Sequence, residues 1–457
     1  MAALAPAESA LTMIENPDFG EAVSYLGFSI SLDQNTLLAG APFSRPEGEL
    51  QAGMACVYVR DALGNWSFLQ ELKGEPSRHG QRMGHAVALH GEAAAVAAGD
   101  KTVYLYRREN SSWFLEQRLP TPAGIQGFGH SLAMEEDLLV VGAREMNESG
   151  EIANGVVFTY IHDSDGWKYE ARLVPDDIAR RDNFAVSIAV HGDVIAVGAP
   201  NQSVDGHASA GAAYIYRRNA SGWAEQGEVH SPIPADGEYF GHSVAVAGDV
   251  VAVGAPGVDM KEADTGAAMV YEFQAGIWSH VATLTGSDAD RGDYFGSAVA
   301  FQDGTIAIGS SNDRPIYVYA IDSRGWMEQA IIREPNFDGT LSPNTVALFS
   351  DVLAFGSPED DDNGRDVGAV YVYSRSGDTW DRDRKLSETR AGGDAFGSAV
   401  ALSEHTVLVG SIQDNFASIY ERDPEGIELT ARVRGDEVSE RDGFGKSAAA
   451  FADVAVV

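Results

Sequence analysis

Two short stretches of the sequence combine side chains that could bind a metal ion. Residues 288–293 read DADRGD and residues 359–366 read EDDDNGRD. Carboxylates spaced along a loop beside a glycine supply the oxygen ligands that calcium prefers, although both stretches lack the distal glutamate of a complete calcium loop. Calcium is therefore the one cofactor that the sequence suggests, with solvated acidic turns as the alternative. The candidate ligands are Asp288, Asp290, Asp293, Asp360, Asp362, Asn363 and Asp366.

Five asparagines stand in the acceptor pattern for N-linked glycans, which marks surface positions in a secreted protein. They are Asn65, Asn110, Asn147, Asn201 and Asn219. Three of the five, Asn65, Asn110 and Asn219, precede a tryptophan at the same point of a repeated pattern, in a predicted turn. A glycan there would be exposed, so the pattern favours an extracellular protein if the source is eukaryotic.

Composition excludes several classes of function. The formal net charge of −36 argues against nucleic acid and anionic lipid as partners, because both would be repelled. No apolar run is long enough for a membrane helix, and the first residues lack the pattern of a signal peptide. The single cysteine, Cys56, stands in the apolar stretch GMACVYVR and is predicted to be buried. No nucleophile elbow, phosphate loop or zinc pattern is present, so we predict no enzymatic activity.

The chain repeats one pattern at intervals of 45 to 57 residues. Its clearest copy is FGHSVAVAGDVVAVGAP at 240–256, and we take the glycine after the phenylalanine as the anchor of each unit. The anchor positions are Gly27, Gly84, Gly129, Ala185, Gly241, Gly296, Pro343, Gly397 and Gly445. A fixed period of this length indicates a repeat architecture.

Each unit predicts four strands. An alternating stretch precedes a turn of two or three residues and an apolar run, and a variable loop then leads to a third and a fourth strand. The fourth strand opens with one of the seven tryptophans, or with Ile427 in the eighth unit. This pattern predicts an all-β fold, a β-propeller of four-stranded antiparallel blades. Eight blades fit the eight complete units, and seven blades with an extra repeat is the alternative. The tryptophans are predicted to pack between blades.

The residues FG and GAP in 240–256 resemble the FG-GAP repeat, and GAP also stands at 40–42 and 198–200. FG-GAP repeats form the propeller of integrin α subunits, so the resemblance implies ligand binding or adhesion. The calcium loops of integrin propellers lie in the first hairpin, which is too short here to hold the ion. The chain therefore resembles a short-hairpin form of the repeat.

The repeat divides the chain into three parts. Residues 1–26 form a lead that contains one possible closing strand, and residues 445–457 open a ninth repeat, which suggests a truncated chain. The propeller at 27–444 comprises the repeats 27–83, 84–128, 129–184, 185–240, 241–295, 296–342, 343–396 and 397–444.

Connections in an up-and-down blade alternate between its two ends. The loops between second and third strands therefore share one face with the links from each fourth strand to the next blade, and we call this the loop face. It carries the long, variable and acidic segments, so we expect a protein or glycan ligand there, without direct membrane insertion. The predicted function is an extracellular or cell-surface binding or adhesion propeller. The alternatives are a cytoplasmic interaction scaffold and a propeller-fold carbohydrate-active enzyme.

One acidic residue recurs three positions before the anchor, as in Asp182, Glu238 and Asp293. Its regularity predicts a structural role, such as accepting hydrogen bonds from backbone N–H groups of the link. The Arg-Gly-Asp triplet at 291–293 ends on this acid, so we interpret the triplet as part of the blade pattern rather than as an adhesion motif.

Overall fold

The computed structural model describes most of the repeated region. The residues described are 12–14, 29–33, 36–42, 46, 52–60, 66–74, 77–99, 102–123, 125, 127–146, 152–179, 181–260, 262–310, 315–333, 346–357, 369–387, 396–402, 406–411, 416–423, 426–434 and 447–451.

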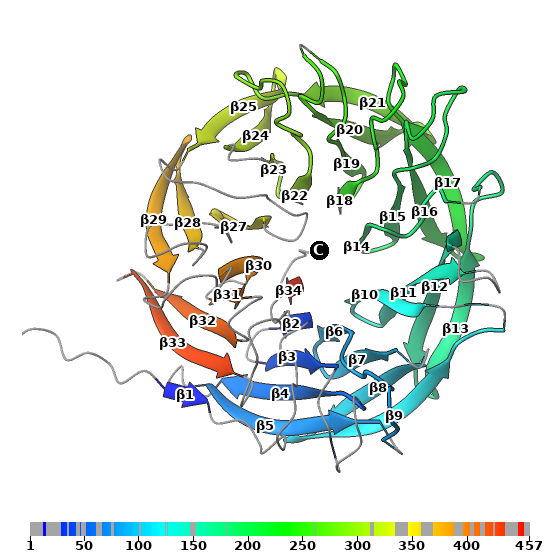
Figure 1. The fold of residues 1–457 in the computed structure, drawn as a ribbon, viewed down its shortest axis with the longest axis vertical. Helices are drawn as coiled ribbons and strands as arrows, with labels where there is room; N and C mark the ends of the chain where they lie inside the picture. Colours follow the sequence, from blue (N-terminus) through cyan, green and yellow to red (C-terminus); the bar gives the residue numbers. More distant parts are fainter. Residues whose placement is uncertain are drawn as a thin grey trace, which may run out of the picture.

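Within this part of the chain the protein is all-β and forms eight sheets around a central axis (Figure 1). Each sheet contains four antiparallel strands that are consecutive in sequence, with the first strand innermost and the fourth at the rim. This is the predicted β-propeller with eight blades. Each blade buries its two faces against its neighbours, which is why the unit is stable only as part of the ring.

The strands run in chain order around the ring. Blade one holds β2 (Ser29–Asp33), β3 (Thr36–Ala41), β4 (Met54–Arg60) and β5 (Trp66–Lys73). Blade two holds β6 (Ala86–His90), β7 (Ala93–Ala98), β8 (Thr102–Glu109) and β9 (Ser112–Pro120). Blade three holds β10 (Phe128–Glu135), β11 (Leu138–Met146), β12 (Ile152–Asp163) and β13 (Gly166–Leu173). Blade four holds β14 (Ile188–His191), β15 (Val194–Ala199), β16 (Ala212–Asn219) and β17 (Gly222–His230).

The second half of the ring repeats this order. Blade five holds β18 (Ser243–Ala247), β19 (Val250–Ala255), β20 (Ala267–Gln274) and β21 (Ile277–Leu284). Blade six holds β22 (Ala298–Gln302), β23 (Thr305–Gly309), β24 (Ile316–Asp322) and β25 (Gly325–Ile332). Blade seven holds β26 (Val346–Phe349), β27 (Val352–Ser357), β28 (Ala369–Ser376) and β29 (Thr379–Ser387). Blade eight holds β30 (Phe396–Leu402), β31 (Thr406–Ser411), β32 (Phe416–Asp423) and β33 (Gly426–Arg434).

Two further strands join blade eight to blade one. The strand β1 (Thr12–Ile14) pairs in parallel with β33 at the rim, and β34 (Ser447–Phe451) pairs in parallel with β2 at the centre (Figure 1). β1 also contacts β5, while β34 also contacts β30. The described part of the stretch that opens the ninth repeat, Ser447–Phe451, thus lies beside the first strand of blade one.

The first hairpins have the tight turns that the sequence predicts. His191 pairs with Val194 and Ala247 pairs with Val250, which leaves two residues in each turn. The first turn residue, Gly192 or Gly248, has a positive φ. Two-residue turns of this kind match the right-handed twist of the strands and leave no loop that could surround a calcium ion.

The predicted position of the tryptophans between blades is also confirmed. In each of the eight blades, the pairing of the third and fourth strands shifts by one residue at the same point, as between Ile215 and Tyr216. The extra residue of the fourth strand can then reach the next blade. Glu170 accepts a hydrogen bond from the indole N–H of Trp223 (2.7 Å), as Gln226 does from Trp278 (3.1 Å).

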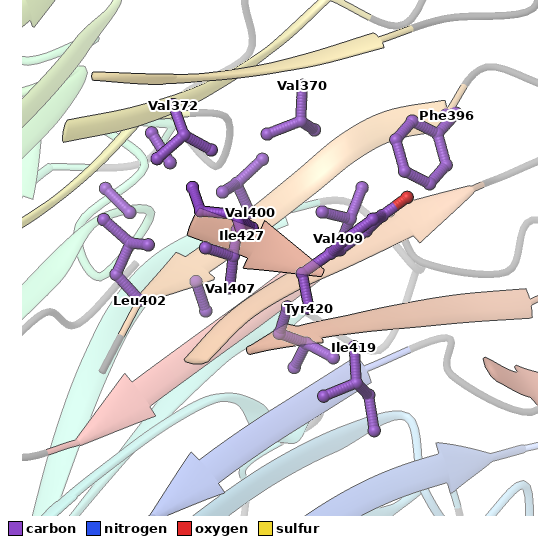
Figure 2. Packing of buried hydrophobic residues seen from close by; sticks show 14 of the residues in the cluster. Val370, Val372, Phe396, Val400, Leu402, Val407, Val409, Ile419, Tyr420 and Ile427 are labelled. Carbon is purple, nitrogen blue, oxygen red and sulfur yellow. The ribbon is translucent and has the colours of Figure 1, made fainter. Parts of the chain in front are cut away.

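The core lies between blades rather than at the centre of the ring. Figure 2 shows one such cluster, in which Val370 and Val372 of blade seven pack with residues of blade eight. Ile427, which stands in the tryptophan position of blade eight, is buried in this cluster at 2% exposure. Cys56 of blade one belongs to the same cluster and is fully buried, as predicted.

Candidate interaction surface

On the loop face, the loops and links over blades four to six are hydrogen-bonded to one another. In the loop between β15 and β16, the carbonyl groups of Ser209 and Ala210 accept hydrogen bonds from Tyr239 and Phe240 of the following link, both at 3.0 Å. The loop between β19 and β20 is bound in the same way to the next link, through Thr265 and Phe295 (3.0 Å). These loops and links therefore share one face, as the alternation of connections predicts, and both loops are bound to the link that follows their blade.

Below this layer, the repeated FG and GAP motifs meet at the joints between blades four and five and between blades five and six. The Ser243 hydroxyl of blade five donates to the carbonyl oxygen of Gly296 in blade six (2.9 Å). A Cβ atom on Gly254 would lie 2.0 Å from the same oxygen, so only glycine allows this approach. Ser187 and Gly198 surround the carbonyl of Gly241 in the same manner. The two motifs are thus the two sides of one contact between neighbouring blades.

The acidic residue that precedes the anchors at 185, 241 and 296 has the structural role predicted from its regularity. Asp182 accepts a hydrogen bond from the N–H of Ala179 (2.6 Å), and Asp293 accepts one from that of Asp290 (2.7 Å). Glu238 is bound to the N–H three residues before it in the same way. All three carboxylates are buried, at 6%, 1% and 4% exposure respectively. The aspartate of the Arg-Gly-Asp triplet at 291–293 is thus a buried link residue.

An exposed apolar group stands on the loop face over blades four and five. It consists of Ile233, Tyr239 and Met260, which are 82%, 43% and 51% exposed. Ile233 and Tyr239 belong to the link between these blades, and Met260 to the next loop. The segments touch, because the N–H of Gly257 donates to the carbonyl of Glu238 (3.0 Å). We call Ile233, Tyr239 and Met260 the apolar patch.

The segments that carry the apolar patch, and the loop bonded to them, also carry exposed carboxylates. Asp205, Asp236, Asp259 and Glu262 are exposed on the same loops and link, and Asp236 also contacts His207 at 3.3 Å. Glu238 lies beneath them and accepts a hydrogen bond from Ser231 (3.4 Å). Burial raises the pKa of Glu238, and its Oε2 atom has no hydrogen-bond partner among the described residues. The surface around the patch is therefore strongly negative.

A second acidic group lies at the joint between blades three and four. The Tyr214 hydroxyl donates to Asp177 (2.8 Å), and the amide of Gln202 lies 3.2 Å from Glu228. Although part of Glu228 is exposed, loss of hydration and the nearby Asp177 raise its pKa to about 7. The Tyr–Asp bond recurs between Tyr317 and Asp288 at 2.9 Å, which makes it a feature of the blade joint.

Three segments of the chain, residues 167–216, 223–271 and 278–319, match the family model of the FG-GAP repeat. Each match begins at the tryptophan that opens a fourth strand and ends in the third strand of the next blade, so it spans one joint. The chain contains FG-GAP repeats. The resemblance drawn from the FG and GAP residues is confirmed, and the contact between Ser243, Gly254 and Gly296 gives it a physical basis.

Comparison with other proteins adds the fold alone. A sequence search among curated proteins finds no significant match. The crystal structure of the computationally designed Ika8 protein is similar, with a TM-score of 0.52 at 14% identity over 85% of this chain and 94% of that chain. Sqt1 of Saccharomyces cerevisiae gives a TM-score of 0.49 at 12% identity over 76% and 83% of the two chains. Among the described residues, no helix has the length and apolar character needed to cross a membrane.

Two of the three predicted calcium ligands in residues 288–293 make contacts within the protein. Asp288 is ion-paired with Arg333 and bound by Tyr317, while Asp293 faces the backbone of its own link. Within the described part of the chain, no three histidine, cysteine or acidic side chains are grouped as metal ligands. The second predicted set, Asp360, Asp362, Asn363 and Asp366, lies outside the described residues, so calcium binding there stays a prediction.

Two of the predicted glycan sites lie at the third hairpin of an FG-GAP blade. Asn110 and Asn219 are exposed at the turn between third and fourth strands, and Asn219 accepts a hydrogen bond from Ser221 (2.7 Å). Asn201 is only partly exposed, and its N–H donates to the carbonyl of Asp182 (3.1 Å). Asn65 and Asn147 lie outside the described residues.

The apolar patch and the Asp177–Glu228 group were not found from the sequence. Ile233, Tyr239 and Met260 follow no period, and only their exposure sets them apart. A proline on either side of Ile233 was the one signal that this apolar residue stands in a loop and not in a strand. Asp177 and Glu228 are brought together by ring geometry, which a single sequence does not reveal.

Proposed function

We propose that this propeller is a non-catalytic binding module that docks a protein partner on its loop face, at the cell surface or outside the cell. The observation that carries the proposal is the apolar patch, which stands exposed among carboxylates on that face. Exposed apolar groups rimmed by polar residues mark interaction sites in soluble proteins. FG-GAP repeats point in the same direction, toward protein binding by a propeller.

The rigidity of the loop face supports the same proposal. Because the loops and links are bonded to one another through Ser209, Tyr239, Thr265 and Phe295, a partner would meet a surface that is already ordered. Binding to a preorganised surface loses less conformational entropy, which leaves more free energy for affinity. The net charge of −36 would also speed the approach of a basic partner.

The proposed location is supported by the two exposed glycan sites. Asn110 and Asn219 occupy the same turn in blades two and four, on the face opposite the loops. Glycans there would leave the loop face free. Secretion of the chain from a eukaryotic cell, followed by mass spectrometry, would detect glycans at these two positions, and unmodified asparagines would remove this support.

Cross-linking from single positions tests which face binds. Cys56 is fully buried and burial raises its pKa, so a cysteine introduced elsewhere is the one that reacts with a maleimide. We would replace Asp205 on the loop face, or Asp193 in a first-hairpin turn on the opposite face, and attach benzophenone to each cysteine. Both positions are exposed. The probes would be irradiated on cells or extracts of the source organism.

The expected result is a protein adduct from the Asp205→Cys probe that excess unlabelled protein prevents, and none from the Asp193→Cys probe. Equal adducts from both probes, or an adduct from the opposite face only, would contradict the proposal. An adduct that resists proteases and yields to glycosidases would replace the protein partner with a glycan.

One observation favours a second candidate function. Glu228, whose pKa is raised to about 7, lies beside Asp177, and glycosidases use a pair of carboxyl groups, one of which has a raised pKa and acts as the acid. Gln202 and Tyr214 already bind this group, and the same Tyr–Asp bond recurs in blade six. Loss of a glycosidase activity in Glu228→Gln would support the enzyme, and it would place the site at the joint between blades three and four rather than at the apolar patch.

A further inference from the structure

We propose that the apolar patch binds a basic segment of the partner that carries at least one large apolar side chain beside its lysines or arginines. This inference rests on the proposed protein-binding function of the loop face and names the chemistry of the partner. It assigns the centre of binding to Tyr239, flanked by Ile233 and Met260.

The first argument is the concentration of exposed apolar surface. Nine large apolar side chains are exposed among the described residues; five of them lie on the fourth strands at the rim and one, Ile321, lies on the third strand β24. The other three form the apolar patch, within 28 residues of one another in sequence. They are joined in space through Glu238, whose carbonyl binds Gly257 and whose side chain binds Ser231.

The second argument is preorganisation of the central residue. Tyr239 has a left-handed backbone with φ of 54°, and its N–H is fixed to the carbonyl of Ser209. A Cβ atom on Gly257 would lie 3.1 Å from the Tyr239 ring, so the ring is packed against the next loop. Tyrosine held in this way buries a large area at little entropic cost, which is typical of residues that dominate binding.

The third argument is charge. Asp205, Asp236, Asp259 and Glu262 are exposed on the segments of the apolar patch or on the loop bonded to them, and His207, the exposed basic side chain described on these segments, already contacts Asp236. Lys261 lies outside the described residues. An apolar segment that carried acidic groups would meet repulsion here, whereas lysine or arginine would meet carboxylates. The unpartnered Oε2 atom of Glu238 adds to the negative potential beneath the patch.

Two synthetic peptides of equal charge test the inference. One is Lys-Lys-Leu-Leu-Lys-Lys and the other is Lys-Lys-Ser-Ser-Lys-Lys, each labelled with fluorescein, and binding is measured by fluorescence anisotropy at low and moderate salt. For the wild-type protein we expect the leucine peptide to bind about fivefold more tightly or better, because two apolar side chains leave water. Salt should weaken both peptides alike.

Variants locate the effect. Tyr239→Asn combined with Ile233→Ser should reduce the preference for leucine to less than twofold, and asparagine tolerates the left-handed backbone. The matched control is Ile277→Ser with Val281→Ser on the outer strand β21, where both side chains are exposed (63% and 45%). The control should keep the preference. Asp259→Asn with Glu262→Gln should weaken both peptides to a similar extent.

No preference for leucine in the wild type would overturn the inference, as would a preference that survives Tyr239→Asn with Ile233→Ser. If this happens while the Asp205→Cys probe still cross-links a partner, the loop face keeps its proposed function and only the assignment to the apolar patch fails. If the loop-face probe itself finds no partner, the proposed function fails whatever the peptides do.

Discussion

The joint between blades three and four differs from the joint between blades five and six in both of its main contacts. At the second, Ser243 binds the carbonyl of Gly296, and Asp288 is neutralised by Arg333. At the first, alanine replaces the anchor glycine at position 185, and Ser131 has no hydrogen-bond partner among the described residues. The same joint holds Glu228 beside Asp177, and among the described residues neither carboxylate has an arginine or lysine partner.

The difference shows which contacts of the repeat tolerate replacement of the anchor glycine by alanine. Ala185 still donates to Gly198 within its own blade (3.1 Å), just as Gly296 donates to Gly309 (3.0 Å). The bond inside the blade therefore survives an added methyl group, whereas the contact with the preceding blade through Ser131 is lost. Since each blade is stable only against its neighbours, the joint at Ala185 should be the weaker of the two.

The largest effect is expected from placing a methyl group at the regular joint. Gly296 has φ of 92°, and a Cβ atom would lie 2.3 Å from the carbonyl oxygen of Ala267. We expect Gly296→Ala to lower the free energy of unfolding by about 3 kcal/mol or more, through backbone strain and overlap together. Denaturant titration followed by circular dichroism measures the loss.

The control for this variant has the same backbone. Gly276 has φ of 90°, and nothing lies within 4 Å of a Cβ atom built there. Gly276→Ala should therefore cost about 1 to 2 kcal/mol, the strain alone. Equal losses at the two glycines would contradict the importance of the joint.

The next largest change in the free energy of unfolding is expected from replacing the serine at a joint. Ser243→Ala removes a buried hydrogen bond and leaves the Gly296 carbonyl without that donor, so we expect a loss of about 1 to 2 kcal/mol. Ser131→Ala removes a hydroxyl that has no partner in the described structure, so its effect should be near zero or stabilising. The same denaturant titration compares the two, and a similar loss from both would show that Ser131 has a partner after all.

Restoring the glycine should strengthen the irregular joint. Ala185 has φ of 69°, a left-handed backbone that suits glycine better than alanine. We expect Ala185→Gly to stabilise the protein by about 1 kcal/mol. If the restored backbone also reaches Ser131, then Ser131→Ala will become costly in the Ala185→Gly background, and a double-mutant cycle measures this coupling.

The smallest effect concerns pH. The pKa of Glu228 rises from 4.5 in the unfolded chain to about 7 in the fold. The protonated carboxyl group therefore contributes fully to the stability of the fold below pH 4.5, and this contribution is lost as the pH rises to about 7. Because part of Glu228 stays in water, we expect Glu228→Gln to stabilise the protein by only about 1 kcal/mol at pH 8. Thermal melts at pH 4 and pH 8 would show a gain at pH 8 only, and a gain of similar size at pH 4 would reject titration as its cause.

Much of the architecture was accessible from the sequence because it is local. The two-residue turn after His191, the tryptophan that opens each fourth strand and the N–H-binding role of Asp182 depend on neighbours a few residues apart. Repetition then showed which of these features belong to the blade. The fold class and the eight blades follow from the same local units.

The interaction surface was less accessible because it depends on contacts between distant residues. The sequence directed attention to acids such as Asp288, yet it did not show that Arg333 would neutralise this one. It likewise gave no reason to choose Tyr239 over Tyr294, which has the same place in the next blade and the same left-handed backbone. Tyr239 differs from Tyr294 only in that its side chain is 43% exposed and shares its segments with the exposed Ile233 and Met260.

The strands that close the ring determine when, during synthesis of the chain, the ring can close. Met13 pairs with Arg432 and Ile30 pairs with Ala448, so neither pairing can form until the ribosome has made the roughly 420 residues that lie between the partners. At translation rates of about 5 to 20 residues per second, this takes roughly 20 to 90 s. During that interval β33 and β34 have not been synthesised, so β1 and the inner edge of β2 are without their partners. The early blades must therefore remain an open arc until the ring closes. A chaperone would be of most use to this protein during that period.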